Sequence, residues 1–303
     1  MKNGVINIYK ERGFTSHDVV AKLRGILRQK KIGHTGTLDP EAEGVLPVCL
    51  GTATRLCDML TDRDKTYEAV LLLGQSTDTQ DTTGTVLKCA DVCVTEDEVR
   101  RGILSFVGRY EQIPPMYSAL KVGGRKLCDL AREGKEVERR ARQVTIYGIE
   151  IHKIALPEVR MSVSCSKGTY IRTLCHDIGE MLGCYGCMKE LVRTRAGRFL
   201  MEDSLRLSEV ERLRDEDRLS EVILPVDQVF AELPMVRLTE QSAKLGHNGN
   251  PFGKTHTAEP DPPDGQVRVY DHQGCFIGIY GFDPERNQYR PVKMFYEKQR
   301  ETI

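Results

Sequence analysis

The sequence has no long apolar segment and no excess of charge. No run approaches the roughly 18 apolar residues of a membrane-spanning helix, and the first ten residues do not form the apolar core of a signal peptide. We therefore expect a cytoplasmic protein that does not enter a membrane. The 44 Lys and Arg residues balance the 44 Asp and Glu residues. This balance argues against a uniformly basic nucleic-acid binder but permits local basic surfaces.

Paired metal-binding motifs are missing as well. A structural zinc site takes four ligands, usually from two closely spaced pairs, but the ten cysteines contain one C-x-x-C, at Cys184 and Cys187. Cys165, Cys175 and His176 precede it without forming a second pair. We therefore expect no metal, and we expect the cysteines to be free thiols in a reducing compartment.

The hydrophobic pattern alternates between strand and helix periods over most of the chain. Thr15 with Asp18, and Thr95 with Glu98, match the capping box that begins a helix. Strands are predicted at residues 5–9, 45–50, 65–73, 144–151 (with a bulge at Gly148) and 159–165. Helices are predicted at residues 16–28, 53–60, 95–107 and 171–182, with a charged, solvated helical stretch at 202–221 and a polar loop at 75–84.

The pattern changes near Leu233. Residues 246–265 are rich in Gly and Pro, and short strands are predicted at 266–270, 275–280 and 291–295. The chain therefore divides into two predicted domains, residues 1–232 and a small β-rich module at residues 233–303.

Residues 33–40, G-H-T-G-T-L-D-P, concentrate polar groups on a short loop. Two glycines three residues apart suit a tight backbone path with a positive φ or a close neighbour, and such loops often carry functional groups. His34 and Asp39 are the candidate side chains. The alternative is structural, because Asp39 followed by Pro40 also matches the start of a helix. No Lys-Ser or Lys-Thr follows the second glycine, so the loop is not a P-loop.

Basic residues gather in three segments, at 24–31, 113–142 and 191–199. The second also contains Pro, Gly and Tyr residues, and a mobile basic arm with an aromatic side chain suits contact with nucleic acid. The alternatives are a solvated helix face and an ordinary charged hairpin. Tyr170 and Arg172 follow a predicted strand at its junction with a helix, which is a second candidate functional edge.

Five segments, in this order, resemble the signatures of the TruB family, the tRNA pseudouridine-55 synthases. They are G-H-T-G-T-L-D-P (33–40), K-T-Y-E (65–68), P-P-M-Y-S-A-L-K (114–121), S-K-G-T-Y-I-R-T (166–173) and R-T-R-A-G-R-F (193–199). The C-terminal module is similar to a PUA domain through V-R-V-Y-D-H-Q-G-C-F-I-G-I-Y-G and R-P-V-K-M-F. The resemblance implies an α+β pseudouridine-synthase fold. Its central sheet is mixed, largely antiparallel and flanked by helices, with a basic RNA-binding insertion at about 113–142 and a small C-terminal β-rich PUA-like domain.

The resemblance also implies a reaction. Such enzymes isomerise uridine to pseudouridine at position 55 in the T loop of tRNA. The stacked base is flipped out into a pocket of apolar and aromatic side chains, the C1′–N1 bond breaks, and C1′ rejoins the base at C5. The balance is redox-neutral, so no cofactor is expected. The implied partner is the T stem-loop of tRNA, with the protein a monomer that has no obligatory protein partner.

By the family pattern, Asp39 is the catalytic aspartate, Arg172 pairs with it, and Tyr67 stacks on the target base and serves in proton transfer. The resemblance leaves open whether Asp39 attacks C1′ or C6, or helps to form a glycal-like intermediate. The residues assigned to substrate binding are His34, Tyr170, Leu191, Lys10, Lys121, Arg125 and Arg193.

Two other functions stay open. The chain could be an RNA-binding protein that helps tRNA to fold and whose catalysis is secondary. It could also be a guide-RNA-dependent synthase of the dyskerin type, which works within a multiprotein particle. The arm-like segment at 113–142 favours direct binding of tRNA.

Overall fold

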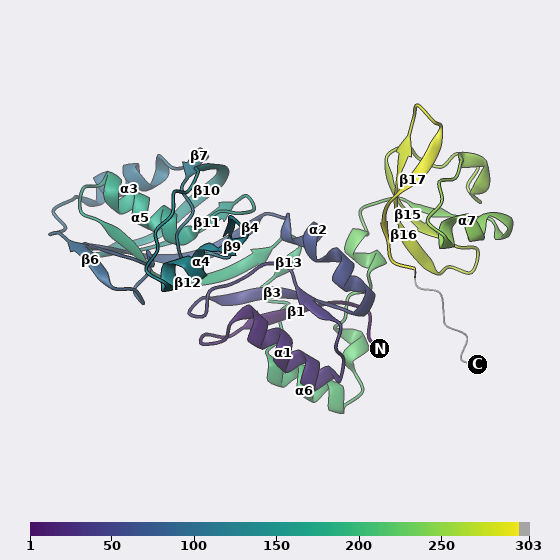
Figure 1. The fold of residues 1–303 in the computed structure, drawn as a ribbon, viewed down its shortest axis with the longest axis horizontal. Coiled ribbons are helices and arrows are strands. Elements are labelled where there is room, and N and C mark those ends of the chain that lie inside the picture. Colours follow the sequence, from purple (N-terminus) through teal and green to yellow (C-terminus); the bar gives the residue numbers. More distant parts are fainter. Residues whose placement is uncertain (297–303) are drawn as a thin grey trace.

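A mixed sheet of nine strands forms the centre of the molecule, for which a computed structural model describes residues 1–296 (Figure 1). The strands are β1 (Gly4–Lys10), β2 (Ile32–His34), β3 (Glu43–Leu50), β4 (Lys65–Leu73), β7 (Gly108–Gln112), β10 (Arg142–Ala155), β11 (Glu158–Cys165), β12 (Gly186–Ala196) and β13 (Phe199–Leu200). Their order is β1-β3-β12-β4-β11-β10-β7, with β2 beside β3 and β13 beside β12. The β3–β12 pair is parallel and the other pairs are antiparallel, which confirms the predicted sheet.

Two pairs of helices cover two halves of this sheet. The helices are α1 (Ser16–Leu27) and α6 (Leu207–Asp215) on the β1–β3 half, and α3 (Glu96–Leu104) and α5 (Ile171–Met181) on the β4–β11 half. Thr15 and Thr95 form the predicted capping boxes at the starts of α1 and α3. Alternate residues of each strand enter the two cores, and Ala69 and Leu71 of β4 are at most 1% exposed. The polar residues that alternate with these apolar residues therefore point away from the two cores.

A third apolar cluster joins the other face of β1 and β3 to the rest of the chain. It contains parts of η1 (Gly51–Leu56), α2 (Cys57–Thr61) and η3 (Asp227–Phe230). Ile279 and Phe295 of the C-terminal module also belong to it, and the rings of Phe230 and Phe295 lie 6.4 Å apart. The C-terminal module therefore packs against the main body through apolar side chains.

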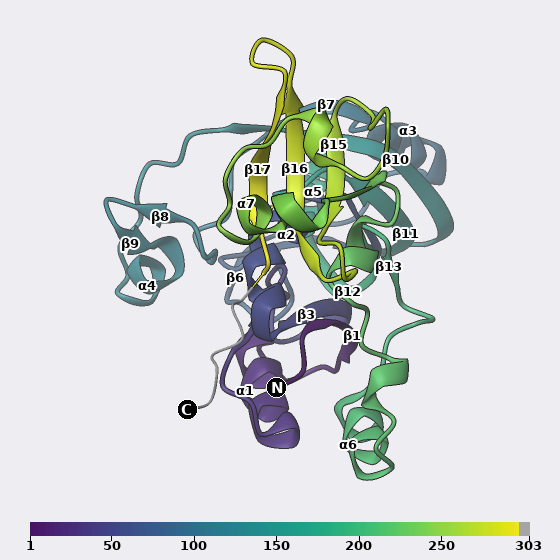
Figure 2. The same ribbon diagram turned by 90° about the vertical axis from the view of Figure 1, so that its right-hand side faces the viewer.

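The C-terminal module has its own four-stranded sheet and core (Figures 1 and 2). Its elements are β14 (Met235–Arg237), η4 (Glu240–Ser242), α7 (Ala243–His247), η5 (Lys254–His256), β15 (Gln266–Tyr270), β16 (Phe276–Asp283) and β17 (Gln288–Met294). Three of its strands match the predicted ones, whereas β14 was not predicted. Residues 246–265, predicted as a loop, include the end of α7 and all of η5.

The segment between β7 and β10 is a small folded unit that projects from the body in Figure 2. It contains β8 (Lys121–Val122), β9 (Arg125–Lys126) and α4 (Leu127–Arg132). Buried Met116, Leu127 and Leu130 form a separate apolar cluster within it. This segment is therefore a charged hairpin, which was the alternative to a mobile basic arm, and one short helix extends it. We call residues 113–141 the arm.

The register shift between Ile146 and Gly148 confirms the predicted bulge. Two other predictions were wrong in part, and the alternative in which Asp39 and Pro40 begin a helix was wrong. The polar stretch 75–84 begins a hairpin of β5 (Gln75–Thr77) and β6 (Val86–Cys89), and the helix predicted at 202–221 is reduced to α6 and η2 (Leu219–Glu221). No helix begins at Pro40, because the chain turns there, with the amide of Ala42 donating to the carbonyl of Asp39.

Within residues 1–296, no helix is both long and apolar enough to cross a membrane. All ten cysteines are free thiols, as predicted.

Candidate active site

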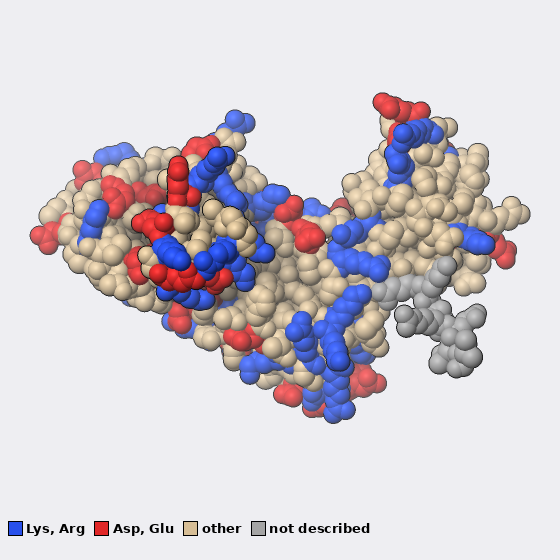
Figure 3. All heavy atoms as spheres, viewed as in Figure 1, with Lys and Arg blue, Asp and Glu red and all other residues tan. Residues whose placement is uncertain are grey.

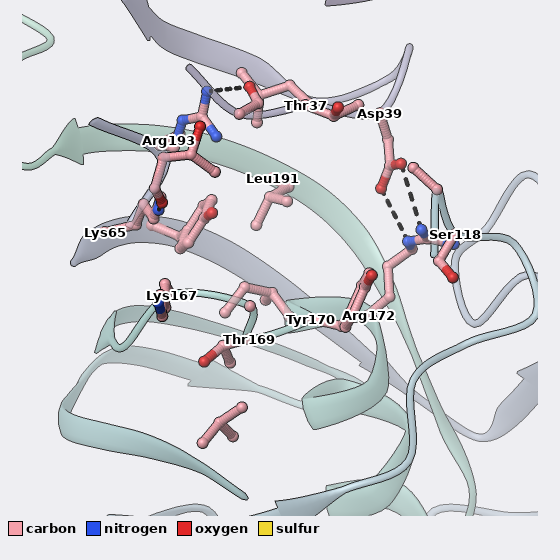
Figure 4. A pocket seen from close by; sticks show the side chains of 18 of the residues that line it. Thr37, Asp39, Lys65, Ser118, Lys167, Thr169, Tyr170, Arg172, Leu191 and Arg193 are labelled. Carbon is pink, nitrogen blue, oxygen red and sulfur yellow. Dashed lines mark hydrogen bonds and ion pairs between the residues drawn. The ribbon is translucent and has the colours of Figure 1, made fainter. Parts of the chain in front are cut away.

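A cavity of about 470 Å³ opens where loop 33–40, β4, β12, the start of α5 and the root of the arm meet (Figure 4). Its volume lies in the range of ligand pockets, roughly 300–1,000 Å³. The side chains that line it include Asp39, Lys65, Tyr67, Ser118, Arg142, Tyr170, Arg172, Leu191 and Arg193. These residues come from distant parts of the sequence, and the sheet brings them together.

Asp39 and Arg172 form a two-pronged ion pair at one side of this cavity (Figure 4). Arg172 Nε lies 2.9 Å from Asp39 Oδ2, and Arg172 Nη2 donates to Asp39 Oδ1 at 3.3 Å. The Arg172 side chain is 6% exposed, whereas that of Asp39 is 39% exposed. A guanidinium fork holds a carboxylate in one orientation. The pair therefore presents an oriented carboxylate to the cavity.

Arg172 is itself held by backbone carbonyls. Its Nη1 donates to the carbonyl of Thr79 at 2.9 Å, and its Nη2 donates to the carbonyl of Tyr117 at 2.8 Å. Asp81 Oδ2 lies 4.0 Å from Arg172 Nε. The guanidinium thus links loop 33–40, the turn between β5 and β6, and the root of the arm.

Two buried cations hold the loop that carries Asp39. Lys10 of β1 donates to the carbonyl of Pro40 at 3.0 Å, and Arg193 of β12 donates to the carbonyl of Gly36 at 3.2 Å. Both side chains are at most 1% exposed, and burial lowers the pKa of Lys10 to about 8. Gly36 has a φ of 132°, in the region that favours glycine, as predicted for this loop. The loop is therefore fixed by contacts to its backbone.

Tyr67 and Leu191 lie side by side on the paired strands β4 and β12. Leu191 pairs with Ala69, and Arg193 pairs with Tyr67. Burial raises the pKa of Tyr67, an effect that the Arg193 guanidinium partly offsets. The Tyr67 hydroxyl therefore keeps its proton at neutral pH. Lys65 lies at the start of β4, and burial lowers its pKa to about 8 while it donates to the carbonyl of Thr61 at 2.6 Å.

Tyr170 lies at the N-cap of α5, at the predicted junction between a strand and a helix. Burial raises the pKa of its hydroxyl, and the nearby hydroxyl of Ser118 opposes that rise. Ser118 Oγ is buried and completes no hydrogen bond with a described residue, so the two hydroxyls approach each other without forming a regular hydrogen bond. Ser118 belongs to the arm, so the arm contributes to the wall of the cavity.

The structure brings six of the ten predicted site residues to the cavity and leaves four outside. Those at the cavity are Asp39, Tyr67, Tyr170, Arg172, Leu191 and Arg193. Lys10 lies behind loop 33–40, fully buried, so in this structure it supports the loop and is out of reach of a bound molecule. His34 is half-buried beside His17, with ring centroids 5.2 Å apart, and burial lowers its pKa. Lys121 and Arg125 are exposed on the arm, where Arg125 pairs with Glu133.

Several lining residues were not singled out from the sequence. Lys65 and Lys167 lie within segments quoted for the resemblance, and Ser118 lies within P-P-M-Y-S-A-L-K. Arg142 was counted only as part of a basic segment. The motifs contained the signal for the first three, but a motif alone does not say which of its side chains faces a cavity.

No group of three or more His, Cys, Asp or Glu side chains among residues 1–296 is arranged to hold a metal ion. The cavity offers two carboxylates, two tyrosines, several hydroxyls and several cations. Such a set can orient a polar ring, stabilise negative charge and move protons.

Comparison with known proteins agrees with this geometry. Residues 24–171 match the description "TruB family pseudouridylate synthase (N terminal domain)". Residues 172–231 match "tRNA pseudouridylate synthase B C-terminal domain", and residues 234–281 match "Pseudouridine synthase II TruB, C-terminal". A protein of Lachnoclostridium phytofermentans named "tRNA pseudouridine synthase B" is 54% identical, and the alignment covers 97% of this chain and 99% of that one.

The chain belongs to the TruB family of pseudouridylate synthases.

Another TruB relative, from Alkaliphilus oremlandii, is 42% identical over 98% of this chain and 100% of its own, and has the same name. Among solved structures, an H/ACA RNP bound to a substrate RNA containing 2′-deoxyuridine contains a chain of the same fold. The two share 27% identity with a TM-score of 0.72, and the alignment covers 98% of this chain and 86% of that one. The pseudouridine-synthase fold predicted from the sequence is therefore confirmed.

Proposed function

We propose that this protein is a tRNA pseudouridine synthase that isomerises the uridine at position 55 in the T loop of tRNA. The observation that carries the proposal is the two-pronged Asp39–Arg172 pair, which faces a cavity lined by Tyr67, Tyr170 and Leu191. The names of the TruB relatives support tRNA as the substrate, because the chain spans nearly their whole length.

In the proposed reaction, Asp39 is the catalytic carboxylate and Arg172 orients it. One oxygen of Asp39 faces the sugar or the base, and the second oxygen keeps its bond to Arg172. The flipped uracil stacks on Tyr67 and packs against Leu191, since base stacking on an aromatic side chain contributes about 1–3 kcal/mol. Rejoining of C1′ to C5 removes the proton from C5 and adds one to N1, and the Tyr67 hydroxyl can pass its own proton on as it receives the proton of C5. Tyr170 closes the opposite wall.

Contacts to the rest of the tRNA come from surfaces outside the cavity. Figure 3 shows Lys and Arg gathered near α1 and α6, and a mixture of both signs over the arm. The exposed cations of the first surface include Lys22, Arg24, Arg28 and Lys30. Local basic surfaces on a chain without net charge suit recognition of RNA by shape and backbone. We assign Lys121 and Arg125 of the arm to the same task, and His34 to the rim around the flipped nucleotide.

We further propose that residues 1–232 form the catalytic domain and residues 233–303 a PUA-like RNA-binding domain, of which residues 297–303 lie outside the described part. The separate sheet and core of the C-terminal module support this division. We also propose that the protein acts in the cytoplasm as a monomer, without a guide RNA. The chain is 54% identical to a relative named for tRNA and 27% identical to the chain in the H/ACA RNP, which favours direct action on tRNA.

The substitution Asp39→Asn tests the proposal. It keeps the size of the side chain and removes the ionised oxygen, so we expect loss of isomerisation with tRNA binding nearly unchanged. Pseudouridine formation is measured by tritium release from C5-labelled tRNA, and binding by a filter assay. Asp58→Asn is the matched control, because it removes the same charge from an exposed position on α2. Substantial turnover by the Asp39→Asn protein would contradict the role of Asp39.

A further inference from the structure

Gln112, the last residue of β7, has a buried side chain that none of the steps above uses. It is 1% exposed, and its amide makes two hydrogen bonds to the backbone of one residue, Tyr170. Gln112 Nε2 donates to the carbonyl of Tyr170 at 2.9 Å, and the amide of Tyr170 donates to Gln112 Oε1 at 2.8 Å. Both polar ends of the side chain therefore bond to the backbone of Tyr170, and the Gln112 amide also approaches the hydroxyl of Tyr110.

Tyr170 depends on this contact because little else fixes its backbone. It follows Gly168, whose φ of 79° marks a turn, and it occupies the N-cap of α5 without a side-chain capping bond. Its carbonyl also accepts the amide of Leu174 at 3.1 Å, in the first turn of the helix. Gln112 provides the partner for its amide, so the residue that lines the cavity is held from the neighbouring strand.

Gln112 also lies at the base of the arm. The arm leaves the sheet directly after Gln112 and returns at Arg142, and these two residues are paired across β7 and β10. Arg142 lines the cavity, and its charge acts on the hydroxyl of Tyr170. Tyr110, two residues earlier on β7, donates a hydrogen bond to Asp177 of α5. The root of the arm and the start of α5 are thus joined by side chains.

We propose that Gln112 is a positioning residue for isomerisation: it fixes Tyr170 against the substrate and couples the placement of the arm to the wall of the active site. This role rests on the proposed function, since Tyr170 matters only if the cavity holds the flipped nucleotide. Gln112 does not contact the substrate itself. Its loss should therefore reduce the rate of the chemical step more than the affinity for tRNA.

The first test compares Gln112→Met with Gln29→Met. Gln29 is a matched control, because it is 7% exposed, makes the same two-bond contact to the backbone of Lys2, and does not line the cavity. For Gln112→Met we expect the single-turnover rate at saturating enzyme to fall about tenfold to a hundredfold, as for small misplacements of an active-site group. The dissociation constant for tRNA should change by less than about threefold. Gln29→Met should leave the single-turnover rate near wild type.

A double substitution separates positioning from a general structural effect. Once Tyr170→Ala has removed the side chain, a misplaced backbone at that position no longer matters. Adding Gln112→Met should then lower the single-turnover rate by less than about threefold. An equal loss in both backgrounds, or wild-type rates for Gln112→Met alone, would overturn the proposal. An inactive wild-type protein would instead refute the proposed function, and this role with it.

If Gln112→Met does not fold, Gln112→Glu provides the test. A carboxylate can accept from the amide of Tyr170 but places its second oxygen against the carbonyl of that residue. Burial raises the pKa of such a glutamate, and the protonated form regains the lost donor. The charged and titratable groups around this position include Tyr110 of β7, Arg142 of β10, Asp39 of loop 33–40, and Arg172, Cys175 and Asp177 of α5.

We therefore expect the rate of the Gln112→Glu protein, relative to wild type, to rise as the pH falls from about 8 to about 6. A ratio that stays constant over this range would overturn the proposal.

Discussion

Arg172→Lys should disable the site although it keeps the positive charge. The guanidinium donates hydrogen bonds to Asp39 Oδ1 and to the carbonyls of Thr79 and Tyr117, and its Nε forms an ion pair with Asp39 Oδ2. A lysine ammonium is a single point at the end of a flexible chain and cannot reproduce a planar fork. If the lysine ammonium keeps the ion pair with Asp39, the carbonyls of Thr79 and Tyr117 lose their hydrogen-bond donor.

The size of the effect follows from these contacts. Each carbonyl left without a donor costs about 1–3 kcal/mol, less where water reaches it, so we expect a loss of about 2–4 kcal/mol in the free energy of unfolding. The rate should fall more steeply, because a misplacement of about 1 Å at the carboxylate costs about a hundredfold. Urea denaturation measures the first quantity and single-turnover pseudouridine formation the second.

Arg195→Lys is the matched control. Arg195 lies on the same strand as the buried Arg193, is half-buried, and makes two weaker contacts, to Thr66 Oγ1 at 3.1 Å and to the carbonyl of Gly197 at 3.4 Å. Its replacement should cost about 1 kcal/mol or less. A rate for Arg172→Lys within about threefold of wild type, or equal losses of rate in the two variants, would refute the view that the guanidinium geometry orients Asp39.

Two further predictions concern stability. Burial lowers the pKa of Lys10 and of Lys65 from 10.5 to about 8. Between these pH values the unfolded chain binds more protons than the folded one, so the free energy of unfolding should rise with pH above about 8. The slope of this rise should be shallower in the Lys10→Met protein. Urea denaturation across this pH range measures the slope, and a slope unchanged by the substitution would contradict the prediction. Gly44→Ala should cost about 3 kcal/mol or more, because Gly44 has a φ of 104° and a Cβ there would lie 2.2 Å from the carbonyl oxygen of Arg193. Gly25→Ala, where a Cβ on α1 meets nothing within 4 Å, should instead gain about 0.5–1 kcal/mol, and equal melting shifts in the two variants would argue against this account.

The predictable parts of the fold are those where periodicity and capping agree. The capping boxes at Thr15 and Thr95 predicted the starts of α1 and α3, and alternation predicted β4 and β11. Strand β12 could not be predicted in this way. Arg193 of this strand is fully buried, and its guanidinium donates to the carbonyls of Val45 and Gly36, which makes the burial of its charge possible. In a sequence pattern an arginine indicates a surface position, so this buried arginine hides the strand.

The same limit applies to the candidate site. The motifs predicted which segments meet at the cavity, including the junction at Tyr170 and Arg172. They did not predict on which side of loop 33–40 each neighbouring side chain lies. Lys10 of β1 was therefore assigned to substrate binding, although its ammonium lies behind this loop and donates to the carbonyl of Pro40. Nothing in the sequence indicated a role for Gln112, because a polar residue at the end of a strand is common. Its hydrogen-bond partner, Tyr170, is 58 residues away in the sequence.

The order of the strands has a consequence for synthesis on the ribosome. Asp39 and Arg172 are 133 residues apart, and translation at about 5–20 residues per second separates their appearance by roughly 7–27 s. During this time β3 has β1 along one edge and the short β2 on part of the other edge, where β12 has yet to join as its parallel neighbour. The emerging chain therefore exposes a strand edge that can pair with another chain, and it carries the carboxylate without the arginine. Activity should appear late and in one step, when β12 joins the two halves of the sheet.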